Sequence, residues 1–135
     1  PRGHAVSVTY MGCGKDIVPK NNVAESSFYS IKQLPELAYD HRDIIQYALE
    51  RLQAKLTYTN AVAAFLPAHF TLSELQRNYE IILDQELDKR NFRKKFLSLG
   101  LITETDEMKR EGAHRPARLY RFTSNSLESL ARSFD

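Results

Sequence analysis

The sequence predicts an α+β fold that is mainly helical, with one β-hairpin close to its C-terminal end. Amphipathic helical patterns with capping residues fill the middle of the chain, a short basic helix follows over residues 87–100, and two strand-like runs come after it. With 42% hydrophobic and 27% charged residues, the 135-residue chain has the composition of a globular protein and not of a disordered one.

The first third of the chain indicates two strands and little else that could form a core. Residues 5–11 alternate apolar and small polar side chains, the period of a half-buried strand, and residues 28–31 indicate a second strand. Two strands with so little apolar surface do not make a stable domain. We therefore expect them to pair with sequence outside this chain, which opens without Met and is expected to be a piece of a longer protein.

A long helix is predicted over about 41–56, with Asp40 as its cap. A shorter helix is predicted over 61–66, capped by Asn60 and stopped by Pro67. The apolar face of the long helix consists of Ile44, Ile45, Ala48, Leu49, Leu52 and Leu56.

The next helix begins with a capping box. Thr71 and Glu74 stand three residues apart, so that each side chain can accept from the other's backbone amide, and Phe70 and Leu75 occupy the staple positions around them. A short turn at 84–86 leads to the basic helix. Two capped helices joined in this way have the arrangement of a helix-turn-helix. The apolar stripe of the first helix consists of Leu72, Leu75, Tyr79, Ile82 and Leu83.

The basic helix has its own start and stop signals. Asp88 can cap its start, with Leu87 and Phe92 at the positions of a hydrophobic staple. Gly100 supplies the positive φ at which helices commonly end. The apolar side chains expected to face the core are Phe92, Phe96 and Leu99.

The opposite side of this helix is cationic. Arg90 and Lys94 stack one turn apart, with Asn91 and Arg93 beside them. In a DNA major groove, arginine reads guanine edges and asparagine reads adenine edges. A solvated basic face is the simpler interpretation of such a helix in isolation, but its position as the second helix of the pair favours DNA.

A hairpin after this helix is predicted from strands at 101–103 and 117–122, joined by a long polar loop, and has the position of a wing. Ser126 is predicted to cap a last short helix carrying Leu127, Leu130 and Phe134. The candidate phosphate or minor-groove contacts of the wing are Arg110, Arg115 and Arg118. The acidic residues of the same loop, which oppose this role if they face phosphate, are Glu104, Asp106 and Glu107.

Positive charge is concentrated in the same part of the chain. Residues 88–122 contain ten Lys or Arg against five Asp or Glu, although the whole chain has a net charge of only +2. A basic patch on a near-neutral protein indicates a docking face for an anion, with nucleic acid as the leading candidate.

No enzyme active site can be assembled from the sequence. His4, His41, His69 and His114 are scattered and do not have metal-ligand spacing. The single Cys13 allows no internal disulfide and has no evident base, so we do not expect it to be a nucleophile. No apolar run has the length of a membrane span. We expect a cytoplasmic protein that is not an enzyme and holds no metal or cofactor in this chain.

Five motifs occur in a specific order: YDHR at 39–42, KLTYTN at 55–60, FTLSELQ at 70–76, LDKRNFR at 87–93 and RPARLY at 115–120. In these motifs, over roughly residues 28–122, the chain resembles the Nudix-related transcriptional regulators of the NrtR type. The resemblance implies a winged helix-turn-helix preceded by a β remnant of a Nudix-like domain. Residues 1–37 would be the C-terminal fragment of that effector domain, and residues 38–135 the winged-helix domain with its linking helix.

The resemblance also implies a function. Members of this family are dimeric repressors of NAD or sugar metabolism genes, bind palindromic operators in double-stranded DNA, and are released by ADP-ribose or a related metabolite. It places Lys89 in the groove helix as well. The residue pattern and the resemblance together predict the DNA contacts. These are Lys89, Arg90, Asn91, Arg93, Lys94, Arg110, Arg115 and Arg118.

The chain departs from the family in one respect. A Nudix box uses paired glutamates to hold Mg²⁺, and this chain contains no Glu-Glu pair. Binding of an ADP-ribose-like effector is therefore expected of the full-length protein and not of this chain. Two alternatives stay open: a fragment of a Nudix hydrolase acting on ADP-ribose or a similar dinucleotide, and a winged helix that binds protein or RNA.

Overall fold

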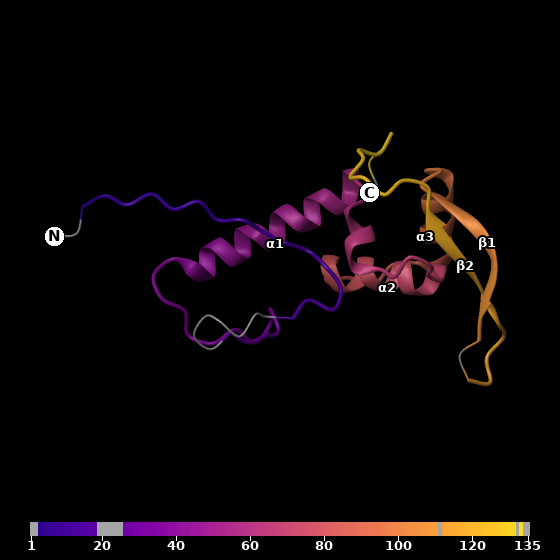
Figure 1. Ribbon diagram of the computed structural model, residues 1–135, viewed down its shortest axis with the longest axis horizontal. Helices are drawn as coiled ribbons and strands as arrows, with labels where there is room; N and C mark the ends of the chain where they lie inside the picture. Colours follow the sequence, from indigo (N-terminus) through magenta and orange to yellow (C-terminus); the bar gives the residue numbers. More distant parts are fainter. Residues whose placement is uncertain (1–2, 19–25, 111, 132, 134–135) are drawn as a thin grey trace.

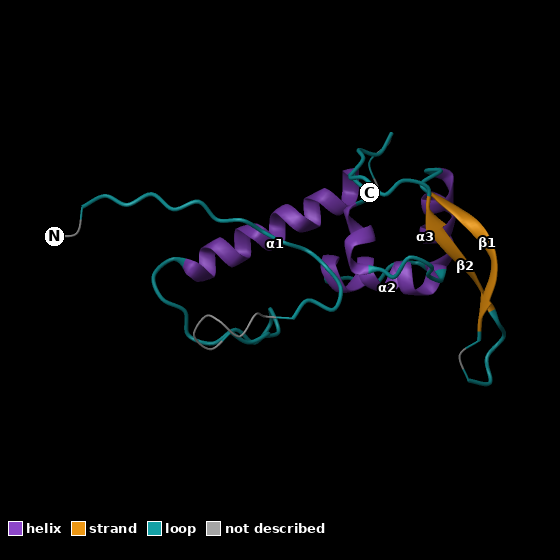
Figure 2. Cartoon of the chain, viewed as in Figure 1, coloured by secondary structure: helices purple, strands orange, loops and turns teal. Residues whose placement is uncertain are grey.

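The computed structural model describes the chain except for residues 1–2, 19–25, 111, 132 and 134–135. The described part contains α1 (His41–Tyr58), the 3-10 helix η1 (Ala61–Phe65), α2 (Leu72–Leu83), α3 (Lys89–Ser98), β1 (Ile102–Lys109) and β2 (Ala117–Phe122). The two strands form one antiparallel hairpin, which projects from the end of the helical body away from the start of α1 (Figure 1, Figure 2). The predicted winged helix-turn-helix is confirmed.

Tyr79 of α2 lies where three helices meet. Its fully buried ring contacts the rings of Phe92 and Phe96 of α3 edge-on, with centroids 5.4 and 5.7 Å away. Its hydroxyl donates to the carbonyl of Leu56 in α1, at 3.3 Å. Because a buried site disfavours the charged phenolate, burial raises the pKa of Tyr79. The core therefore holds α3 by its aromatic side, as the sequence predicted.

The turn between α2 and α3 is fixed by side chains of α2. Gln76 donates to the carbonyl of Leu87 at 2.8 Å, and the Glu80 carboxylate accepts from the Leu87 amide at 3.0 Å. Asp84, with φ of 54°, ends α2 in the left-handed region. The residue before the cap of α3 is thus bonded through both backbone groups, which sets how the two helices join.

The capping predictions for α2 and α3 are confirmed. Thr71 Oγ1 accepts from the Glu74 amide at 3.1 Å, and Glu74 Oε2 accepts from the Thr71 amide at 2.8 Å. Asp88 accepts from the Asn91 amide at 2.8 Å. Gly100 ends the following turn with φ of 67°. Both helices of the pair therefore begin where the sequence placed their caps.

The hairpin is joined to the helices by a short bridge. Phe70, just before α2, exchanges two backbone hydrogen bonds with Tyr120 of β2, at 3.0 and 2.7 Å. The ring of Phe70 also contacts that of Phe122, with centroids 5.1 Å apart. Along the hairpin, the register shifts between Glu104 and Met108, where the pairing of β1 with β2 is irregular.

The two strands predicted in the first third are not formed. The described residues of 3–18 and 26–40 contain no strand, and apolar side chains such as Val6 and Tyr10 are about nine-tenths exposed, at 95% and 89%. A strand needs a neighbour to take its backbone hydrogen bonds, and the sheet found in the described chain contains only β1 and β2. The assignment of residues 1–37 to a Nudix-like domain stays a prediction.

The prediction of a helix after Ser126 was wrong, because hydrogen bonds from Asn60 hold this segment in a non-helical conformation. The buried Asn60 side chain donates to the Ser126 carbonyl at 2.9 Å and accepts from the Glu128 amide at 2.8 Å. Ser129 pairs with Thr59 in an isolated bridge. Asn60 consequently makes no side-chain cap on η1. Asp40 makes no side-chain cap on α1. Phe134 lies outside the described residues.

Candidate nucleic-acid interface

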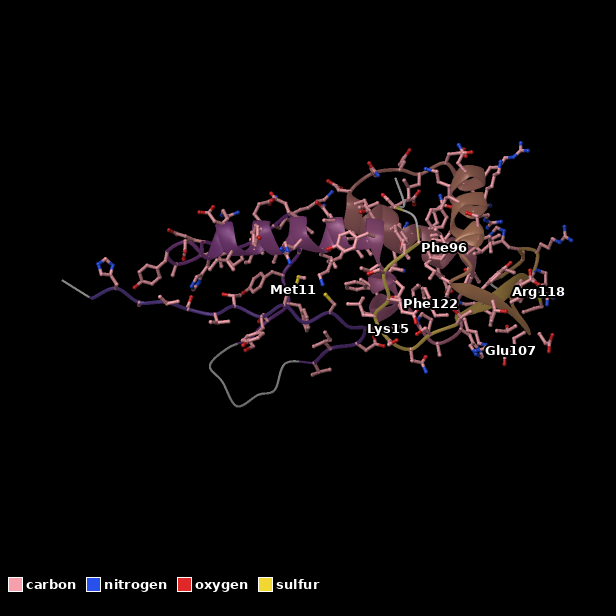
Figure 3. All side chains as sticks on the ribbon, turned by 90° about the horizontal axis from the view of Figure 1, so that it is seen from above. Met11, Lys15, Phe96, Glu107, Arg118 and Phe122 are labelled. Atoms are coloured by element: carbon pink, nitrogen blue, oxygen red, sulfur yellow. The ribbon has the colours of Figure 1, made fainter. Side chains whose placement is uncertain are left out.

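The outer side of α3 is the cationic face that the sequence predicted. Phe92 and Phe96 are buried on the inner side, and Phe96 lies within the helical body in Figure 3. Opposite them, Arg90, Asn91 and Lys94 are exposed. Lys89, at the first helical position, is exposed as well. The face is ten residues long, a length of about 15 Å at helical rise, which suits a major groove.

The two central cations of this face are free of internal partners. Among the ion pairs and hydrogen bonds of the described chain, none involves the side chain of Arg90 or Lys94. The nearby carboxylate of Asp88 is turned to the backbone amide of Asn91. Arg90 and Lys94 can therefore meet an external anion without first breaking an internal ion pair.

Arg93 lies differently from its neighbours. It is half-buried, its guanidinium donates to Ser73 Oγ at the start of α2 at 3.2 Å, and its Nε is buried without a hydrogen-bond partner. Its charge is close enough to favour the phenolate of Tyr120, although burial dominates and raises the pKa of that residue. The structure thus places Arg93 at the border between α3, α2 and the wing, not in the middle of the cationic face.

The wing carries the three arginines that the sequence singled out. Arg110 and Arg115 are exposed on the segment that joins β1 to β2. Arg118 is exposed on β2, where it donates to the carbonyl of Thr105 across the hairpin at 3.1 Å, and Figure 3 shows it at the hairpin end of the molecule. The three arginines therefore lie on the hairpin and not on α3.

Strand β1 is longer than predicted, and it contains acidic residues that the sequence had placed in the loop. Glu104, Asp106 and Glu107 lie in the strand and not in the loop. Glu104 accepts from the Tyr120 hydroxyl at 3.2 Å, and Glu107 contacts His69 Nδ1 at 2.9 Å. Two of the three carboxylates are thus engaged by residues of the domain itself, although all three residues are exposed.

Lys109 joins the wing to α2, a contact that the sequence did not predict. Its ammonium group donates to Glu74 Oε1, while Glu74 Oε2 caps α2. Burial alone would raise the pKa of Glu74, but Lys109 and the Thr71 amide outweigh it, so that its pKa lies below the ordinary value of 4.5. The sequence predicted the capping box. It did not predict that Lys109 pairs with Glu74, because this contact depends on how far β1 extends.

A hollow of about 470 Å³ lies away from the predicted DNA contacts. It is lined by η1, the residues that follow it and the segment after β2, and none of the predicted DNA contacts borders it. Within the described ranges, no group of three His, Cys, Asp or Glu could hold a metal ion. No helix of the described chain is long and apolar enough to cross a membrane.

Comparison with known proteins agrees with this geometry. Residues 62–122 match the NrtR DNA-binding winged helix domain, which runs from η1 to the end of β2. Over 127 residues the chain is 39% identical to the ADPR responsive transcriptional repressor NtrR of Acinetobacter baylyi, covering 90% of this chain and 50% of that protein.

Two solved structures are similar. NrtR of Shewanella oneidensis complexed with a 27mer DNA has a TM-score of 0.62 and 31% identity, covering 78% of this chain and 48% of that one. The structure of Shewanella oneidensis NrtR alone has a TM-score of 0.59 and 34% identity, covering 76% and 46%. The chain therefore spans about half the length of the proteins that it matches.

The Glu74–Lys109 pair gives a pH-dependent prediction. Glu74→Gln removes the charge at nearly constant shape, and we expect the free energy of unfolding in urea to fall by about 0.5–1 kcal/mol at pH 7, because the pair is partly exposed. Since the folded pKa of Glu74 lies below its unfolded value, its contribution is present above about pH 4.5 and is lost as the pH falls through the folded pKa.

The difference between Glu74→Gln and the unchanged protein should therefore be constant near neutral pH and shrink below pH 4.5. Lys32→Ala serves as the control, because it removes an ion pair with Asp84 whose two side chains are 69% and 66% exposed. A difference for Glu74→Gln that stays the same at pH 3 would show that the charge of Glu74 does not stabilise the wing contact.

Proposed function

Because this chain belongs to the NrtR family through its winged-helix DNA-binding domain at residues 62–122, we propose that it is the DNA-binding part of a sequence-specific transcriptional repressor. The observation that carries the proposal is the free, exposed pair Arg90 and Lys94 on the outer side of a helix anchored by aromatic residues. A relative that was solved with DNA supports it. We propose no enzymatic activity for the chain.

The two parts of the proposed interface have different roles. Lys89, Arg90, Asn91 and Lys94 enter the major groove on α3, where Arg90, Asn91 and Lys94 meet base edges. Arg93 approaches the edge of the groove from its position beside Ser73. The wing contributes phosphate contacts, which supply affinity without direct sequence reading, or minor-groove contacts. These wing residues are Arg110, Arg115 and Arg118.

The longer protein is proposed to work as a homodimer on a palindromic operator and to leave it when ADP-ribose or a related metabolite binds a Nudix-like domain. The ADPR responsive relative supports this, and the chain corresponds to about half of that protein. We propose NAD or sugar metabolism genes as the targets, on the family resemblance. The cell compartment proposed is the cytoplasm.

Binding to duplex DNA should depend steeply on salt. With about five phosphates contacted, the logarithm of the affinity should fall against the logarithm of the salt concentration with a slope of roughly −4 to −5. Fluorescence anisotropy of a labelled duplex measures this slope. Arg115→Ala, which removes a proposed phosphate contact of the wing, should make it shallower by about one, and a slope near zero for the unchanged chain would reject the DNA-binding role.

Specificity should depend on Arg90. Replacing it with alanine should cost about 1–3 kcal/mol at its base pair, because a bidentate contact is lost, and should relax the preference at that position. Competition between a cognate duplex and duplexes changed at single base pairs measures both effects. Arg51→Ala is the matched control, since Arg51 lies on α1 over the ring of Tyr47. An unchanged preference in Arg90→Ala would show that Arg90 does not read a base.

Effector response should be a property of the longer protein. We expect ADP-ribose to release the full-length parent from a duplex selected out of a random library, while this chain stays bound in the same assay. The reason is that the proposed effector site lies in the half that the chain does not span. Release of this chain by ADP-ribose would place the effector site inside the winged-helix part, and no release of the parent would contradict the proposed effector.

A further inference from the structure

We propose that Leu97 of α3 contacts the 5-methyl group of a thymine in the major groove and so determines the sequence preference at that base pair. The inference rests on the proposed DNA-binding function and deepens it, because the residues so far assigned to base reading are all polar. An apolar side chain would read a feature of the groove that charged and amide groups do not.

Leu97 lies on the same face as the two free cations. Arg90, Lys94 and Leu97 follow one another at spacings of four and three residues, which places them in one stripe along α3. The buried Phe92 and Phe96 lie on the other side of the helix. Leu97 is 45% exposed, so this stripe of α3 faces solvent at Leu97 as well as at the two cations.

An exposed leucine at this place is informative because the domain has few of them. Among the described residues of 62–122, the strongly exposed large apolar side chains are Ile81 on α2, Leu97 on α3 and Met108 on β1. Leu97 alone of these is on the proposed groove helix. An apolar group gains free energy by leaving water for another apolar surface, and the apolar group of a major groove is the thymine methyl.

The helix geometry sets where that thymine should be. Seven residues separate Arg90 from Leu97, a distance of about 10 Å along the helix axis. Successive base pairs are about 3.4 Å apart, so a helix lying along the groove brings Leu97 to a base pair about three steps from the one that Arg90 reads. A helix entering by its tip would leave Leu97 outside the groove, and the experiment separates these two arrangements.

The experiment replaces thymines one at a time with deoxyuridine, which lacks only the 5-methyl group. It uses this chain and a duplex selected by it from a random library. We expect the affinity to fall about fourfold when a thymine about three base pairs from the Arg90 position is replaced, which is the effect of one buried methyl. Leu97→Ala should bind the thymine and deoxyuridine duplexes equally, and Leu97→Met should keep part of the preference.

Ile81→Ala is the matched control, because it removes an exposed apolar side chain of α2 and should leave the thymine preference intact. Circular dichroism checks that Leu97→Ala is folded, and Leu97→Met supplies a second variant of similar size. If deoxyuridine has the same effect at every thymine, or if the thymine preference survives in Leu97→Ala, the proposed role of Leu97 is overturned. The DNA-binding function still stands in that case if Arg90→Ala loses specificity. Failure to select any duplex overturns both proposals.

Discussion

The packing of Phe92 and Phe96 against Tyr79 is the contact on which the rest of the proposed interface depends. Three buried rings fix the rotation of α3 about its axis, and a rotation of the helix would turn its cations away from a duplex. The hydrogen bonds of Gln76 and Glu80 to Leu87 fix the start of α3 against α2. An apolar contact thereby determines where the charges of the outer face lie.

Features that depend on neighbouring residues could be predicted from the sequence. The Asp88 cap, the Gly100 stop and the two faces of α3 each follow from positions within one or two turns, and all three are present. The capping box of Thr71 and Glu74 is local in the same sense. The spacing of the residues was therefore enough to predict the candidate site on α3 and the exposure of its two central cations.

Features that depend on distant partners could not be predicted. Ser126 was expected to cap a helix, but Asn60 binds the backbone on both sides of Leu127, and this favours an extended segment. The length of β1 follows from its pairing with β2, so the ion pair of Lys109 with Glu74 was not visible in the sequence. The strand-like pattern at 5–11 has the right alternation but no neighbouring strand in the described chain.

The bridge between Phe70 and Tyr120 has a consequence for the order in which the domain assembles. It joins residues fifty positions apart, and closing so long a loop costs more entropy than forming the nearby contacts of the helix pair. We therefore expect the helix pair to form first and the hairpin to dock on it last.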